Sequence, residues 1–238
     1  MIVRADGNRQ LLITQPDHAA LAARLMREWR ADGLPDSPRR DVILLAIERH
    51  DHGWLEVDSA PMVDDESGEI LDFIGTPDDI KRGVWPNVVA QLEADPYAAA
   101  LVAQHAVHIY RRYRGNPDWM PFFYTMETAR DRQLLRSTPL AFEDLERDYV
   151  FLRVGDLLSL TFCNGWTDVQ QDDLGLNYSF HLEGNRVPVT PDPFQGREIP
   201  FEISARALPQ GGFKSALEAQ AAFGAAPMVV LQGVAAGA

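Results

Sequence analysis

The chain has 238 residues, of which 46% are hydrophobic and 24% are charged, and its formal net charge at pH 7 is −13. This composition is typical of a globular protein that is long enough to bury a sizeable core. Binding to nucleic acid backbones or to anionic membranes requires clustered Lys and Arg, so the acidic balance disfavours both kinds of partner.

Nothing in the sequence indicates an exported or membrane-inserted protein. The first ten residues lack the basic and apolar pattern of a signal peptide, and no apolar run reaches the length that crosses a bilayer. Cys163 is the only cysteine, which excludes an intrachain disulfide. We therefore expect a cytoplasmic protein.

The N-terminal stretch predicts a hairpin followed by a helix. Two short strands, residues 2–5 and 10–14, flank a turn signal. Thr14 is a suitable N-cap for the helix that follows, which we expect to reach about Arg30. Helical spacing places His18 on the apolar stripe of this helix.

A second helix ends in a histidine and an aspartate. The apolar run 42–47 predicts a buried helix, and His50 and Asp51 continue its core-facing stripes just before Gly53. A carboxylate and an imidazole that face a core are costly unless they are paired or bind something. A metal ion would satisfy both side chains at once.

The middle of the chain predicts a long irregular segment and then helices. Residues 52–76 show no clear periodicity, and a loop of this length that leaves from the His-Asp pair suggests a lid over a site. Helices are expected over 77–93 and 96–113, and the second of these carries His105 and His108 on one face.

Two further helices are expected over 121–136 and 140–163, and Asp156 lies in the middle of the apolar stripe of the second. After Gly165 frequent prolines interrupt short apolar segments, which predicts strands with one helix near 214–223. The predicted strands of this part are residues 176–180, 199–203 and 228–231.

These elements predict a mainly α fold. We expect a helical bundle with a small antiparallel β-sheet, formed by the N-terminal hairpin and the C-terminal third. We expect one domain over 1–238, with a helical core that contains the metal site at about 15–165 and a β-containing appendage of residues 1–14 and 166–234.

The order of the inward-facing polar residues resembles the HD superfamily of metal-dependent phosphohydrolases, whose fold is a helical bundle. The hallmark of that superfamily is a lone His, then a His-Asp doublet that closes a helix, then a distant Asp in a later helix. His18, the doublet His50-Asp51 and Asp156 match that order. The chain departs from the pattern at Trp54 and Leu157, where basic residues are common in the superfamily.

Nearly the whole chain also resembles a bacterial family known only as domain of unknown function 3891. The similar stretches are residues 13–18, residues 50–54 with Asp58, and the pair Asp72-Phe73. This second resemblance implies no activity.

The HD resemblance implies a divalent transition metal, Mn, Fe, Co, Ni or Zn, as one or two ions. We expect Asp51 and His105 to be the catalytic residues. The candidate metal ligands are His18, His50, Asp51, His105, His108 and Asp156.

The function that we expect is hydrolysis of a small phosphorylated molecule by a metal-activated water. An iron-dependent oxygenase is the alternative enzyme, and it would need a second metal bound by His105 or His108. A non-catalytic protein that binds a ligand or a metal is the third possibility. Plainer roles for the same residues are an N-terminal cap for His18, a buried salt bridge to an arginine for Asp156 and core packing for His105 and His108.

Overall fold

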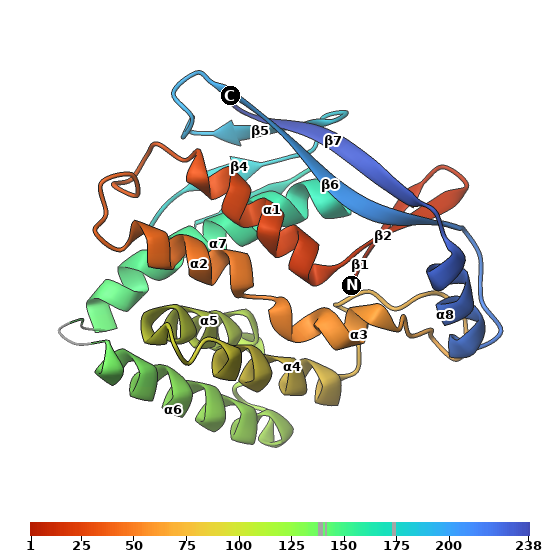
Figure 1. Ribbon diagram of the computed structural model, residues 1–238, viewed down its shortest axis with the longest axis horizontal. Coiled ribbons are helices and arrows are strands. Elements are labelled where there is room, and N and C mark those ends of the chain that lie inside the picture. Colours follow the sequence, from red (N-terminus) through yellow and green to blue (C-terminus); the bar gives the residue numbers. More distant parts are fainter. Residues whose placement is uncertain (138–139, 141, 173–174) are drawn as a thin grey trace.

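The computed structural model describes residues 1–137, 140, 142–172 and 175–238 (Figure 1). Its helices are α1 (Gln15–Arg27), α2 (Arg40–Arg49), α3 (Leu55–Ser59), α4 (Asp78–Gln91), α5 (Pro96–Ile109), α6 (Met120–Arg136), α7 (Phe142–Asn164) and α8 (Ala216–Ala225), with 3₁₀ turns η1 (His52–Trp54), η2 (Arg111–Tyr113) and η3 (Pro117–Trp119). Its strands are β1 (Ile2–Asp6), β2 (Arg9–Ile13), β3 (Val169–Gln171), β4 (Tyr178–Phe180), β5 (Arg186–Thr190), β6 (Glu198–Pro209) and β7 (Met228–Gly237). The helix predicted over 140–163 includes residue 141, which lies outside the described residues.

Local sequence signals account for the start of α1. The hydroxyl of Thr14 accepts a hydrogen bond from the backbone N–H of Asp17 at 3.2 Å and donates to the Asp17 carboxylate at 2.7 Å. Pro16 occupies the first turn, where its missing N–H leaves no hydrogen bond unmade. The predicted cap is therefore confirmed, and it places His18 in the first turn of α1.

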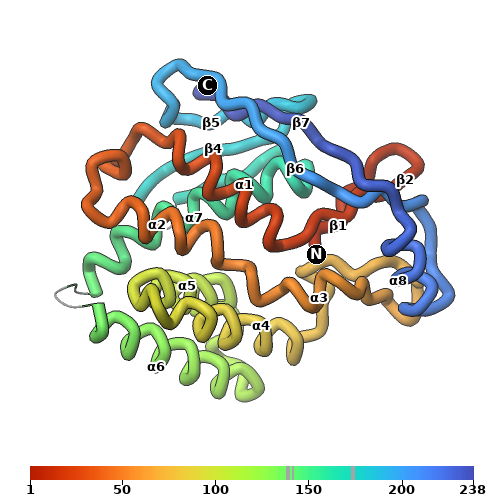
Figure 2. Tube along the Cα trace, in the orientation of Figure 1, coloured from red at the N-terminus to blue at the C-terminus, as the bar shows by residue number. Residues whose placement is uncertain are grey.

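The predicted fold class is wrong, because the strands do not form a small antiparallel sheet on a helical bundle. Within the described residues, seven strands form one mixed sheet in the order β1-β2-β6-β7-β5-β4-β3. The pair β5 and β7 is parallel, and the other neighbouring strands are antiparallel. Strand β6 brings the first and last parts of the chain together, since it pairs with β2 and with β7 (Figure 2).

The physical reason for this correction is the length of the central strand pair. The register between β6 and β7 runs from Glu198–Ala236 to Arg206–Met228, so both strands are long enough to recruit further strands on each side. The burial of β6 alternates along the strand, with one face toward the core and the other toward solvent. The short apolar segments that predicted isolated strands are therefore parts of one continuous sheet.

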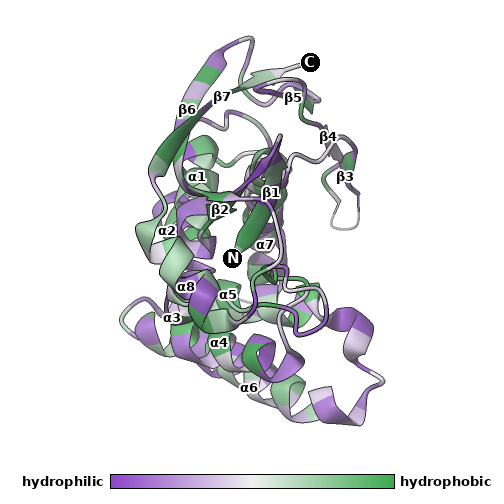
Figure 3. Ribbon diagram, turned by 90° about the vertical axis from the view of Figure 1, so that its right-hand side faces the viewer, coloured by the Kyte–Doolittle hydropathy of each residue, from purple (hydrophilic) through white to green (hydrophobic). Residues whose placement is uncertain are grey.

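The sheet curls around α7 and α1 (Figure 3). Helix α7 contacts β1 near one edge of the sheet and β3, β4 and β5 near the other, while α1 packs on β6. On its remaining sides α7 packs against α1, α2 and α5. Every residue of α7 from Asp148 to Cys163 is buried except Arg153, so this helix lies at the centre of the molecule.

A glycine allows α7 to approach its neighbours closely. A Cβ atom at Gly155 would lie 2.8 Å from Cγ of Met26 on α1 and 3.4 Å from a methyl carbon of Ile47 on α2. This close contact fixes the position of the next residue, Asp156, relative to α1 and α2. Within the described residues no helix combines the length and apolar character needed to cross a bilayer.

Candidate metal centre

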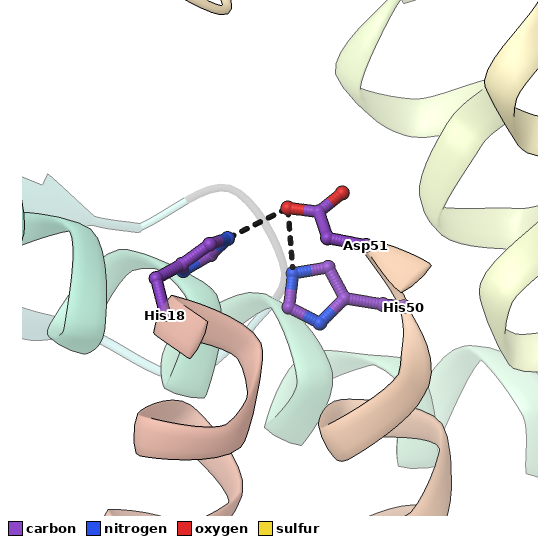
Figure 4. Close-up of side chains that lie close together, drawn as sticks. All are labelled: His18, His50 and Asp51. Carbon is purple, nitrogen blue, oxygen red and sulfur yellow. Dashed lines mark hydrogen bonds and ion pairs between the residues drawn. The ribbon is translucent and has the colours of Figure 1, made fainter. Parts of the chain in front are cut away.

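Three of the predicted ligands meet where α1 and α2 come together (Figure 4). His18 lies in the first turn of α1, His50 caps the C-terminus of α2, and Asp51 follows directly. Oδ2 of Asp51 lies 2.6 Å from Nε2 of His18 and 3.4 Å from Nε2 of His50. Both histidines are completely buried and Asp51 is 5% exposed.

His50 also belongs to a second group of potential ligands. Its Nε2 atom lies 3.6 Å from Oδ1 of Asp156 on α7, and Nε2 of His105 on α5 lies 3.9 Å from Oδ2 of the same carboxylate. In each of the two groups the potential ligand atoms lie within 4.8 Å of one another. Four helices thus bring five of the six predicted ligands to one buried place.

His108, the sixth predicted ligand, belongs to neither of these two groups. Its Nε2 atom accepts a hydrogen bond of 2.6 Å from the guanidinium of Arg111, and its ring lies 5.3 Å from the ring of Tyr149. This histidine therefore positions an arginine near the end of α5.

Hydrogen bonds fix the orientation of each imidazole in the centre. Nδ1 of His50 donates to the carbonyl of Ile47 at 2.7 Å, so its Nε2 atom faces the carboxylates. The hydroxyl of Ser159 donates to the carbonyl of Asp156 at 3.0 Å, so its oxygen accepts the hydrogen on Nδ1 of His18 at 2.9 Å.

The third imidazole, that of His105, is oriented by Tyr149 on α7. Nδ1 of His105 lies 3.1 Å from the hydroxyl of Tyr149. Support of this kind sets the tautomer of metal-binding histidines and is common around metal sites. Sequence analysis found none of these supporting groups, although Ser159 lies one turn beyond Asp156, at a spacing that puts both on one helix face.

Burial and the neighbouring charges shift the pKa values of the ionisable side chains in the centre. Burial disfavours the protonated form of His50, but the carboxylates of Asp51 and Asp156 outweigh it and raise the pKa of His50 to about 9. Burial favours the neutral acids, yet His50 holds the pKa of both carboxyl groups below their usual range. Burial lowers the pKa of His105 to about 3, against the opposing effect of Asp156.

The residues fit a divalent metal ion. The buried Nε2 atom of His50 has no hydrogen-bond partner, although it lies between two carboxylates. Nitrogen and oxygen ligands at about 2.0–2.2 Å from a metal lie about 3.0–3.6 Å from each other. The separations of 3.4 Å and 3.6 Å from His50 to Asp51 and Asp156 fall in that range, and the 2.6 Å between His18 and Asp51 is shorter, so these two side chains must move apart to bind one ion. Two imidazoles with two carboxylates suit a borderline transition metal.

Asp156 also forms the buried salt bridge with an arginine that the sequence offered as its alternative role. Nη1 of Arg153, one turn earlier on α7, lies 2.9 Å from Oδ2 of Asp156. The other oxygen, Oδ1, is the atom that faces His50. The arginine and a metal ion can therefore share this carboxylate, one at each oxygen.

Comparison with known families gives one match. The family described as "Protein of unknown function (DUF3891)" matches residues 1–210. The chain belongs to this family. None of the curated proteins and none of the solved structures matches the chain. These comparisons do not show the expected similarity to the HD superfamily, and the description of the matching family names no activity.

A pocket of about 220 Å³ opens beside the candidate centre of this DUF3891 protein. Asp51, His105 and Asp156 form its polar end. Segment 52–76, for which we predicted a lid, supplies part of the wall through Trp54, Phe73 and Ile74. The remaining lining residues are Gln15, Trp85, Ile109, Tyr110, Arg111, Arg153, Leu157, Leu160 and Trp166.

Proposed function

We propose that this protein is a metal-dependent hydrolase that acts on a small phosphorylated molecule. Its ion is one of Mn, Fe, Co, Ni or Zn. The proposed ligands are His18, His50, Asp51 and Asp156. The observation that supports this proposal is the buried Nε2 atom of His50, which lacks a hydrogen-bond partner and lies between two carboxylates.

We favour one ion over two. Both groups of potential ligands use His50, and the Nε2 atom of an imidazole has a single lone pair, which binds a single ion. A second ion would therefore depend on His105 and on further ligands, while His108 is engaged with Arg111. The iron-dependent oxygenase, which needs two metals, is for this reason the weaker candidate.

Each residue has a distinct role in the proposed reaction. A bound divalent ion would lower the pKa of a coordinated water and make hydroxide available near neutral pH. His105 lines the pocket with its Nε2 atom toward Asp156, where its neutral imidazole can accept a hydrogen bond from the attacking water and position it. Arg153 balances the charge of Asp156 and borders the space that a phosphate group would enter.

The first test is elemental analysis of protein purified without chelators or a nickel column. We expect about one equivalent of transition metal in the wild type and little in Asp156→Asn. His52→Ala is the matched control, because His52 follows the doublet but belongs to neither ligand group, and it should retain the metal.

The second test is release of phosphate from small phosphomonoesters by the metal-loaded protein, with Asp51→Asn as the inactive control. Wild-type protein without metal, and without thermal stabilisation by any of the five ions, would contradict the metal site. Tightly bound metal without release of phosphate from any ester would contradict the hydrolase and favour a binding protein.

A further inference from the structure

Buried polar atoms without hydrogen-bond partners gather around the pocket beside the centre. Two donors, the indole N–H of Trp54 and the Nε–H of Arg153, lack partners, and both residues line this pocket. Unpaired buried groups of this kind each cost about 1–3 kcal/mol, so their concentration at one place points to a ligand that pairs with them.

The guanidinium of Arg153 has one donor that is hydrogen-bonded to Asp156 and one buried donor that is not hydrogen-bonded. Its Nη1 donates to Asp156 at 2.9 Å, whereas its Nε–H is buried and has no acceptor. A guanidinium presents donors in a planar fork that fits two oxygens of a phosphate. Since Asp156 is a proposed metal ligand, this fork would bind the oxyanion directly beside the metal.

Trp54 and Gln15 extend the polar end of the pocket. Trp54 belongs to η1, which follows the His-Asp doublet, and offers one neutral N–H donor. The carboxylate of Asp58 accepts a hydrogen bond from the backbone N–H of Gln15 at 2.5 Å. This bond fixes the backbone that carries the side-chain amide of Gln15. Arg153 supplies a positive charge from another helix.

The rest of the pocket is small and mostly apolar, with Arg111 and Tyr110 as its other polar residues. Its walls include Phe73, Ile74, Trp85, Ile109, Leu157 and Leu160. Pockets for drug-sized ligands usually have volumes of about 300–1,000 Å³, so a pocket of about 220 Å³ takes a smaller molecule. Polyhydroxylated sugars would leave their hydroxyl groups without partners against these walls.

The geometry points to a substrate class: a phosphomonoester of a small apolar or aromatic alcohol, with its phosphate held by Arg153 and Trp54. This inference rests on the proposed function, because it assumes that the group bound beside the metal is the phosphate that is hydrolysed. The apolar part of the substrate lies against Phe73 and Leu157, and the size of the pocket limits it to about a single ring.

Calorimetric titration of the metal-loaded protein tests this inference with phosphonates, which are not hydrolysed. Benzylphosphonate should bind at least about tenfold more tightly than dihydroxypropylphosphonate, because the ring buries apolar area. Phenylacetate distinguishes a carboxylate from a phosphate as the oxyanion, and it should bind more weakly than benzylphosphonate. Equal affinity for the two phosphonates, or tighter binding of phenylacetate, would overturn the substrate class.

Two variants test the proposed donors. Arg153→Lys keeps the charge but loses the planar fork, and should weaken benzylphosphonate binding about tenfold. Arg147→Lys is the matched control, because Arg147 lies on the same helix, is exposed and pairs with Asp144. Trp54→Phe keeps the ring and removes the N–H, and should weaken binding several-fold. Unchanged affinity in both Arg153→Lys and Trp54→Phe would overturn the role of these donors.

The outcomes separate this inference from the proposed function. If benzylphosphonate binds in a manner that depends on Arg153, but phenyl phosphate is never hydrolysed, the pocket is correctly assigned and the hydrolase is wrong. If phenyl phosphate and glycerol phosphate are hydrolysed with equal kcat/KM, the hydrolase stands and the apolar substrate class is wrong. Metal content is measured for each variant, so that loss of the ion is not mistaken for loss of phosphonate binding.

Discussion

The Nε2 atom of His18 lies 2.6 Å from Oδ2 of Asp51, although 33 positions separate the two residues in the sequence. The opposite nitrogen of His18 is held at 2.9 Å by Ser159, which in turn donates to the carbonyl of Asp156. A chain of close polar contacts therefore links the backbone of one proposed ligand to the side chain of another. It passes through a third ligand, so the three are oriented as a unit.

The hydrogen bond from Ser159 should matter for metal affinity. Ser159→Ala removes the acceptor that fixes the hydrogen of His18 on Nδ1, and loss of such support typically lowers metal affinity about 10–100-fold. Competition titration with a chromophoric chelator measures this change. Thr161→Val is the matched control, because the Thr161 hydroxyl is also buried on α7 but bonds to the carbonyl of Leu157. Equal metal affinity in the two variants would contradict a role for Ser159 in orienting His18.

His105 and His108 should differ in their effects. His105 lines the pocket and faces Asp156, so His105→Gln should retain the metal, misplace the attacking water and lower kcat for phosphomonoester hydrolysis about 10²-fold. His108→Gln should retain both the metal and kcat, because His108 contacts Arg111 and Tyr149 and belongs to neither ligand group. Metal content and kcat are measured on the same preparations. Two equivalents of metal in wild-type protein, reduced to one by His108→Gln, would instead support a two-metal centre.

Helical periodicity predicted most of the polar residues that meet in the centre, but it also predicted His108, which belongs to neither ligand group. His18, His50 and Asp156 each continue an apolar stripe, and the structure brings them together with Asp51 because α1, α2 and α7 pack against one another. The supporting residues could not be predicted in the same way. Which imidazole Ser159 holds depends on how α7 crosses α1, and that crossing is a property of the packing, not of the spacing within either helix.

Strand positions were easier to predict than strand pairing. The stretch after Gly165 has short apolar segments between prolines that indicate strands, but such segments do not show which strands are neighbours. The parallel pairing of β5 with β7, and the pairing of β2 with β6, join parts of the chain that are far apart in sequence. A local pattern does not contain this information, so we predicted a small antiparallel sheet where a single seven-stranded mixed sheet exists.

The close approach of α7 to α1 should be sensitive to one methyl group. Gly155→Ala places a Cβ atom 2.8 Å from Cγ of Met26, so we expect a loss of about 1–3 kcal/mol in the free energy of unfolding. Gly83→Ala in α4 is the matched control, because nothing lies within 4 Å of its added Cβ, and a helical Gly→Ala change there should stabilise by about 0.5–1 kcal/mol. Urea unfolding measures both changes, and stabilisation by Gly155→Ala would show that α7 does not pack as closely as described.

A buried network should hold together the three helices that carry most of the centre. Asp148 on α7 is 3% exposed and accepts hydrogen bonds from Arg39, which directly precedes α2, and from the hydroxyl of Tyr97 on α5 at 2.7 Å. Removing one partner of a buried ion pair leaves the other charge uncompensated, so Asp148→Ala should lower the free energy of unfolding by about 3–5 kcal/mol.

The matched control for this network is Asp144→Ala. Asp144 lies one turn earlier on α7 and also faces Arg39, at 3.5 Å, but its side chain is 25% exposed. An ion pair that is partly open to solvent contributes little, so this change should cost less than about 1 kcal/mol. Because α2, α5 and α7 carry His50, His105 and Asp156, Asp148→Ala should also weaken metal binding, whereas Asp144→Ala should not. Equal destabilisation by the two variants in urea unfolding would show that the network does not hold these helices in place.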